Sequence, residues 1–237
     1  MSAFAQSFRT AFELIVHADS ALLRTVALSL WVSGCACLIA SGFGLALGAW
    51  LAVARFPGHR LLLLALNTLL ALPSVLVGLV VYLLLSRSGP LGSWGILFTP
   101  SAMVFAQTLL VLPIVAALTR QLVADALRDG GDQLRSMGAA PLNCALLMLV
   151  HARWAVMTVL IAAFGRAIAE VGAVMIVGGN IDGFTRVMTT AIALETSKGD
   201  LPLALALGLV LLAVVALLNA LLGLVRRGQG SALAGVR

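Results

Sequence analysis

Long apolar runs separated by short polar stretches dominate the chain. An α-helix needs about 20 apolar residues to cross the hydrocarbon core of a membrane. Five segments come close to or exceed that length, and they cover approximately residues 25–53, 61–85, 101–118, 155–177 and 201–225. Pro73 and Pro113 fall inside the second and third segments, where each is expected to kink its helix. The pattern therefore predicts an all-α integral membrane protein with about five transmembrane helices.

Composition supports the same class. The chain is 62% hydrophobic and only 10% charged, whereas soluble domains are about 45–50% apolar and about 25% charged. An excess of this size cannot be buried in one core of 237 residues, so the surface must face lipid. The net charge is +6, but the basic residues cluster at the ends of apolar runs and form no stripe with interleaved aromatics. They indicate membrane orientation and argue against nucleic-acid binding.

The domain organisation follows from these runs. Residues 1–20 place Phe4, Phe8 and Phe12 at helical spacing among polar residues, which predicts an amphipathic helix lying at the membrane interface. Residues 21–225 form the transmembrane domain, and residues 226–237 form a short tail. Arg and Lys are more abundant on the side that carries the tail. We therefore expect a plasma-membrane (cell inner membrane) protein with its N-terminus outside and its C-terminus in the cytoplasm.

The linker at residues 120–154 is the main cytoplasmic feature of this arrangement. Gly138 is suited to end one helix, and Pro141 is suited to the first turn of the next. The linker then presents a short helix that docks into a groove of a partner protein, or it is an ordinary loop.

A cation and an anion interrupt the fourth apolar segment. Arg166 and Glu170 are four residues apart, so they share one face of a helix. An ionised side chain at the centre of a membrane costs about 2.5–3.5 kcal/mol, and an ion pair lowers that cost. Two interpretations remain open: a buried pair that fixes helix register or a subunit interface, and a gate pair that changes partners during transport. Direct contact with a dianionic substrate is disfavoured because Glu170 would repel it.

A polar stretch follows the fourth segment. Gly178, Gly179 and Asn180 either cap the helix or form a flexible constriction whose backbone amides meet a passing anion. Thr189, one of several hydroxyl residues that follow, either lines a path or bonds to helix carbonyls. Residues 178–200 are too apolar for a solvated loop and too polar for a crossing, which favours a re-entrant or bundle-packed segment.

The residue inventory argues against an enzyme. None of the three histidines has an obvious Ser or Cys partner, and the three cysteines complete no metal-binding set. The phosphate-binding pattern Gly-x-x-x-x-Gly-Lys-Ser/Thr does not occur. We therefore expect no catalytic residues, no metal and no cofactor bound by this chain. A membrane-embedded enzyme and a non-transporting membrane scaffold remain as alternatives from other classes.

Two stretches resemble known families. "DQLRSMGAAPLNCALLMLVHARW" resembles the cytoplasmic motif of binding-protein-dependent ABC transporter permeases, with Asp132 at the position of the family's Glu and Gly138 at that of its Gly. Gln133 and Leu134 replace the family's two alanines, and His151 replaces its proline. "AFGRAIAEVGAVMIVGGNI" and "TRVMTTAIALETSKGDLPLALALG" are similar to the C-terminal half of tungstate permeases, and more loosely to molybdate permeases.

The resemblance implies a type I ABC importer permease fold and a division of labour. An extracytoplasmic protein would bind the oxyanion, two permease subunits (a homodimer) would form the path, and two cytoplasmic ABC ATPase subunits would use the ATP. The residues that would couple to the ATPase are Asp132, Gly138, Ala139, Ala140, Pro141 and Leu142. The residues that would belong to the gate or path are Arg166, Glu170, Gly178, Gly179, Asn180 and Thr189. Tungstate is the expected substrate, with molybdate or another anion such as sulfate as the alternative.

Overall fold

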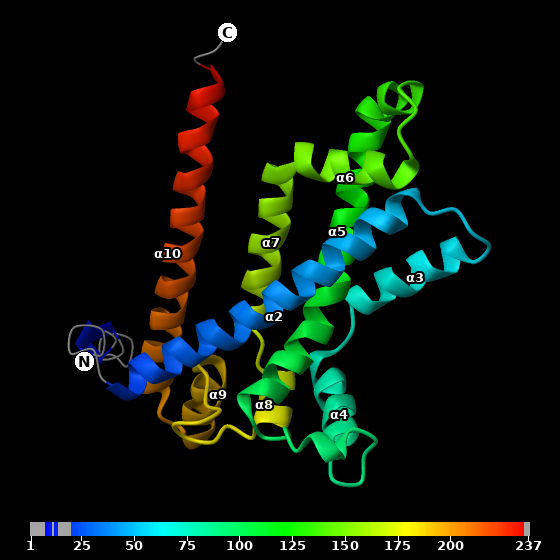
Figure 1. The fold of residues 1–237 in the computed structure, drawn as a ribbon. Helices are drawn as coiled ribbons and strands as arrows, with labels where there is room; N and C mark the ends of the chain where they lie inside the picture. The colour runs from blue at the N-terminus through cyan, green and yellow to red at the C-terminus, as the bar shows by residue number, and fades with distance from the viewer. Residues whose placement is uncertain (1–7, 11, 14–19, 235–237) are drawn as a thin grey trace. The chain divides into compact units, whose positions relative to one another are not determined.

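The computed structural model describes residues 8–10, 12–13 and 20–234, so most of the predicted interfacial helix at 1–20 lies outside the described residues. The described part is built from helices and contains no strand (Figure 1). The helices are α2 (Ser20–Val53), α3 (His59–Leu70), α4 (Ser74–Leu85), α5 (Pro100–Ser136), α6 (Pro141–His151), α7 (Arg153–Ile168), α8 (Gly172–Gly178), α9 (Met188–Lys198) and α10 (Leu201–Ala234), with a short 3₁₀ turn at Gly92–Trp94.

The helices divide into two compact units. Residues 31–179 form the first, and the described residues of 1–30 and 180–237 form the second. In the first unit α5 packs against α3, α4, α6, α7 and α8. Small residues let α2 approach α5 closely: a Cβ on Gly48 would lie 2.7 Å from Thr119 Cβ. Ala40, Val111, Val115 and Ala163 belong to the core between these helices.

Two of the five predicted crossings are single long helices. α2 and α5 are long and apolar enough to cross a membrane on their own. α5 also runs well past the predicted end at residue 118, because the polar stretch that follows continues the helix to Ser136.

The other predicted crossings differ from the expectation of continuous helices. The segment at 61–85 consists of α3 and α4, which meet at a bend of 102°. Pro73 breaks the helix here rather than kinking it, because a proline disfavours helical backbone at the preceding residue and then starts the next helix well. The segment at 155–177 consists of α7 and α8, separated at residues 169–171.

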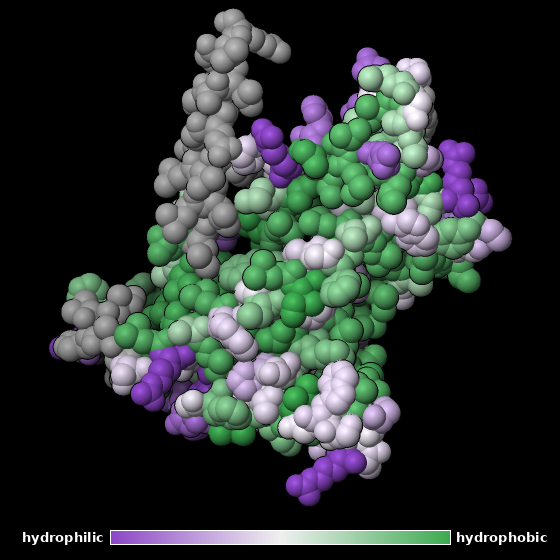
Figure 2. Space-filling model, in the orientation of Figure 1, coloured by the Kyte–Doolittle hydropathy of each residue, from purple (hydrophilic) through white to green (hydrophobic). Residues whose placement is uncertain are grey.

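The count of crossings roughly agrees with the predicted five. In the described part, two helices can cross alone, and up to four crossings result if the bent pairs α3–α4 and α6–α7 each count as one. Residues 201–217 of α10 add a shorter apolar helix. Figure 2 shows hydrophobic residues over most of the visible face, with hydrophilic residues gathered near the ends of helices. This distribution is typical of helices that face lipid.

The second unit is organised around α9 and α10. Leu22, Met188 and Val210 form its buried core. The Met188 amide donates a hydrogen bond of 2.9 Å to Ser29 Oγ, which ties the start of α9 to α2. Residues 180–200 lie in this unit. The two alternatives for residues 178–200, a re-entrant segment and a bundle-packed one, stay predictions.

Candidate functional site at two helix breaks

Glu170 lies in the break between α7 and α8, and it is the best-buried charged residue among the described side chains of the first unit. Its side chain is only 3% exposed. Arg166 Nη1, in the last turn of α7, donates to Glu170 Oε2 at 2.7 Å. The Ala173 amide, at the start of α8, donates to Oε1 at 3.1 Å. The hydroxyl of Ser74, the first residue of α4, donates to the same carboxylate. One carboxylate therefore joins three helices.

This arrangement brings the two helix breaks together. Ser74 follows the break at residues 71–73, and Glu170 occupies the break at residues 169–171. Interrupted helices at corresponding places in a membrane protein are a good indication of a transport site, because their free backbone ends can bind polar groups. The predicted Arg166–Glu170 pair is confirmed as a contact. The helix that was expected to carry both residues ends between them, at Ile168.

Close packing of α4 on α8 supports the carboxylate. A Cβ on Gly78 would lie 2.8 Å from the Ala173 Cα, and a Cβ on Gly172 would lie 2.9 Å from Ser74 Oγ. Only glycine allows backbones to approach this closely. The close backbones of α4 and α8 thus fix the positions of Ser74 and the Ala173 amide beside Glu170.

A buried amide holds the end of α7. Gln107, on α5, is 3% exposed, and its Nε2 donates to the Ala167 carbonyl oxygen at 3.0 Å. That carbonyl lies in the last turn of α7, where helix carbonyls lose their intrahelical partners. The same carbonyl oxygen also accepts from the Glu170 amide at 3.1 Å, so Gln107 adds a second hydrogen bond next to the break. A polar residue in an apolar segment was the only sequence signal for it.

Arg166 is only partly covered. Its side chain is 42% exposed, whereas that of its partner is buried. A charged group in a spanning segment cannot face lipid without a large cost. The exposed side of Arg166 must therefore meet another protein surface or a water-filled path.

The predicted coupling segment has the expected local geometry. α5 ends at Ser136, and Gly138 has a φ of +83°, the left-handed conformation that terminates helices. The Ala139 amide donates to the Leu134 carbonyl oxygen at 3.1 Å, which closes this turn. Pro141 then begins α6. The predicted helix end at Gly138 and helix start at Pro141 are both confirmed.

A groove lies beside this segment. It has a volume of about 1030 Å³, and its lining includes Arg55, His59, Arg128, Asp132 and Pro141. α6 meets α7 at a bend of 77° and packs on α5 through the buried residues Cys144 and Ala145. Met137 and Leu142, on either side of the turn, are exposed apolar side chains. A projecting turn beside a polar groove is a surface to which a partner protein can bind.

The end of α8 shows the capping geometry. Gly179 has a φ of +71° and its amide donates to the Met175 carbonyl oxygen at 3.0 Å, so the prediction of a C-terminal cap is confirmed. Gly178 is buried as the last residue of α8. A Cβ on Gly179 would lie 2.9 Å from the Phe98 ring. The alternative role as a constriction stays a prediction.

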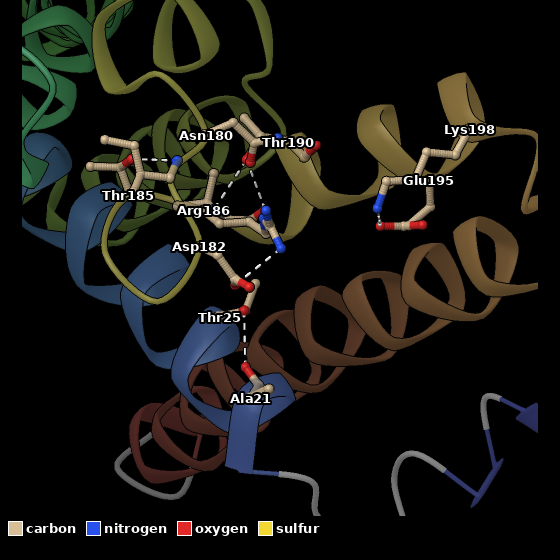
Figure 3. A network of polar contacts seen from close by, with 11 residues as sticks. Ala21, Thr25, Asn180, Asp182, Thr185, Arg186, Thr190, Glu195 and Lys198 are labelled. Carbon is tan, nitrogen blue, oxygen red and sulfur yellow. Dashed lines mark hydrogen bonds and ion pairs between the residues drawn. The ribbon is translucent and has the colours of Figure 1, made fainter.

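In the second unit, hydroxyl groups close the loop that precedes α9 (Figure 3). Thr185 Oγ1 accepts from the Ile181 amide at 2.9 Å, and Thr190 Oγ1 accepts from the Val187 amide at 3.1 Å. Asn180 Nδ2 donates to the Thr190 carbonyl oxygen at 3.4 Å. Arg186 Nη1 pairs with Asp182 at 3.0 Å. These bonds fix the loop, and the choice between a path-lining role and carbonyl bonding for Thr189 stays a prediction.

The predicted path residues fall in different parts of the structure. Arg166 and Glu170 are in contact, while Gly178 and Gly179 lie at the far end of α8 from Glu170. Asn180 and the buried Thr189 belong to the second unit. Sequence reasoning missed Ser74 and Gln107, because each is a single polar residue far along the chain from Glu170.

The groups gathered at the helix breaks are suited to binding an anion. Within the described ranges, no group of three or more His, Cys, Asp or Glu residues comes together as a metal site. The donors are an arginine, a hydroxyl and a backbone amide, which are groups that bind oxyanions and carboxylates. The described helices thus define an α-helical membrane protein with a charged clamp at two helix breaks, formed by Glu170 with Arg166, Ser74 and the Ala173 amide.

Comparison with known proteins finds relatives that match most of this chain. The chain is 42% identical over 226 residues to the tungstate uptake system permease protein TupB of Peptoclostridium acidaminophilum, covering 94% of this chain and 97% of that protein. It is 42% identical to a probable anion ABC transporter permease protein of Haloferax volcanii, over 84% of this chain and 88% of that protein. It is 38% identical to TupB of Campylobacter jejuni, over 90% and 89% of the two chains. No family model matches the chain.

Similarity at this level over nearly the full length of both chains shows common descent and a common fold. The chain belongs to the permease subunits of ABC transporters.

Proposed function

We propose that this chain is the membrane-spanning permease subunit of an ATP-driven importer of tungstate. The observation that carries the proposal is the 42% identity to a tungstate uptake permease over 94% of this chain and 97% of the relative. The buried clamp at the helix breaks supports it, because an oxyanion path needs cationic and hydrogen-bonding groups at membrane depth.

The proposal includes partners. Cytoplasmic ABC ATPase subunits hydrolyse the ATP, and an extracytoplasmic binding protein delivers the oxyanion. A second copy of the permease completes the path, which would cover the exposed side of Arg166. The turn between α5 and α6 faces the cytoplasm and docks on the ATPase, with the N-terminus outside and the C-terminus in the cytoplasm. The supporting observations are the projecting turn at Gly138 and the adjacent groove.

Within this proposal the Arg166–Glu170 pair is the gate. The pair connects α7 to α8 and, through Ser74, to α4. Movement of the ATPase subunits would be passed along α6 to α7, which it meets at a bend of 77°. A shift of α7 changes the contacts of Glu170 with α4 and α8, which supplies the two states that alternating access requires.

The substrate can be tested by uptake. We expect cells that lack this permease, but retain the binding protein and ATPase, to accumulate at least tenfold less tungsten from submicromolar tungstate, as measured by inductively coupled plasma mass spectrometry. Complementation with the intact chain should restore uptake. Molybdate and sulfate are offered in parallel, because both are tetrahedral dianions. Uptake of sulfate in preference to tungstate would overturn the assignment, and preference for molybdate would favour the alternative substrate.

The docking surface can be tested by crosslinking. In a background without the native cysteines, single cysteines at Met137 and Leu142 should form disulfides with cysteines placed across the ATPase surface. Cysteine at Leu38, an exposed apolar residue in the middle of α2, is the matched control and should not crosslink. If several pairs at the turn fail while the complex purifies intact, docking at this turn is wrong. If no ATPase copurifies at all, the non-transporting scaffold becomes the better description.

A further inference from the structure

We propose that Glu170 fills an oxyanion-binding site as a tethered carboxylate, and that a transported tetrahedral oxyanion replaces it on Arg166 and Ser74 during passage. The inference rests on the proposed function and deepens it, because it names where the permease itself contacts its substrate. It also removes the objection that Glu170 repels a dianion. The carboxylate and the oxyanion would occupy the site in turn, not together.

The contacts of Glu170 are those of a bound anion. Its carboxylate is 3% exposed and receives a charge-assisted hydrogen bond from Arg166 at 2.7 Å and a hydroxyl hydrogen bond from Ser74. A guanidinium and a hydroxyl bind the oxygens of a carboxylate and those of a tetrahedral oxyanion in the same way. A site that holds one of these groups can therefore hold the other.

An incoming anion can reach this site from the side of Arg166. The guanidinium carries five N–H donors, and the Arg166 side chain is 42% exposed. An oxyanion can thus bind the open edge of Arg166 while Glu170 is still in place. Repulsion between the two anions then favours a rotation of Glu170 away from the guanidinium.

Release of Glu170 has a structural consequence. The same carboxylate accepts the Ala173 amide at 3.1 Å and the Ser74 hydroxyl, so it fastens the start of α8 to the start of α4. When the oxyanion takes the carboxylate's place, these two connections are lost together. Occupation of the site by substrate would therefore loosen α8 from α4, and departure of the substrate would let Glu170 close it again.

Binding to purified protein tests the proposal without transport. The intact complex in lipid nanodiscs is titrated with tungstate, molybdate and sulfate by isothermal calorimetry, in the absence of the external binding protein. Glu170→Ala should bind at least one of these oxyanions at least tenfold more tightly than the unaltered complex. Arg166→Gln combined with Glu170→Ala should abolish the gain. Ser74→Ala combined with Glu170→Ala should weaken it.

A matched control separates this effect from loss of a carboxylate in general. Glu195 pairs with Lys198 at 2.9 Å outside the clamp, and Glu195→Ala should produce no new oxyanion binding. If Glu170→Ala does not purify, Glu170→Gln retains the shape of the side chain without its charge. Tungstate should then raise the melting temperature of Glu170→Gln more than that of the unaltered complex.

The outcomes are distinct. No gain of binding in Glu170→Ala and no added thermal shift in Glu170→Gln would overturn the proposal, as would a gain that survives removal of Arg166. If the variants gain oxyanion binding but cells show no tungstate uptake, the site stands and the proposed function fails. If uptake is confirmed but the variants gain no binding, the transport function stands and this inference fails.

Discussion

Arg166→Glu is expected to reduce tungstate uptake at least 100-fold. The substitution places a second carboxylate beside the buried Glu170 and removes the cation that pairs with it. Breaking a buried ion pair by removing one partner costs about 3–5 kcal/mol, and each 1.4 kcal/mol corresponds to about tenfold in an equilibrium. The clamp that joins α7, α8 and α4 should therefore no longer form. Uptake by cells and melting of the purified complex measure the two consequences.

The exchanged pair, Arg166→Glu with Glu170→Arg, is expected to restore only part of this loss, to about a tenth of normal uptake. The exchange restores the attraction between residues 166 and 170. However, the Ala173 amide and the Ser74 hydroxyl both donate to residue 170. An arginine there is itself a donor and cannot accept these two hydrogen bonds, so both would be lost. Lys198→Glu, which reverses a charge in the Glu195–Lys198 pair, is the control and should leave uptake close to normal. An exchanged pair no better than Arg166→Glu would show that the ion pair is not the functional unit.

Gly78→Leu is expected to remove most transport and to lower the melting temperature of the complex. A Cβ at this position already meets the Ala173 Cα at 2.8 Å, and a backbone atom cannot rotate out of the way. Overpacking of this kind costs about 1–3 kcal/mol or more. Separation of α4 from α8 would also pull Ser74 and the Ala173 amide away from each other, so that Glu170 could not bind both.

Gly34→Leu is the control for this substitution. Gly34 lies in α2, in the same unit, and a Cβ there would meet nothing within 4 Å. It should change the melting temperature and uptake only slightly. If Gly78→Leu behaves like Gly34→Leu, the close approach of α4 and α8 is not needed for function.

Several features of the site could be predicted because they depend on short stretches of sequence. The helix end at Gly138 and the start at Pro141 follow from the backbone preferences of these two residues, and the cap at Gly179 follows from the same rule. The Arg166–Glu170 contact follows from a spacing of four residues and from the cost of a lone charge in an apolar segment. Neighbours along the chain decide each of these features.

Other features could not be predicted because distant residues decide them. Ser74 and Gln107 reach the α7–α8 break from α4 and α5, and neither shows a local pattern that points to Glu170. The end of α7 at Ile168 was also missed, since the segment is continuously apolar apart from the charged pair. The Glu170 side chain accepts from the Ala173 amide, which a continuous helix would have satisfied by itself, and Gln107 adds a second bond to the Ala167 carbonyl oxygen.

The amino-acid sequence alone determined that this is a helical membrane protein, where most of its apolar segments lie, and which two charges pair within one of them. These properties depend on the length of apolar runs and on residue spacing, which are local quantities. Only the tertiary structure decided that two of the segments are broken and that a single buried carboxylate joins the ends of both breaks. That result depends on backbones that approach each other at Gly78 and Gly172, and such contacts between distant segments leave no spacing pattern in a single sequence.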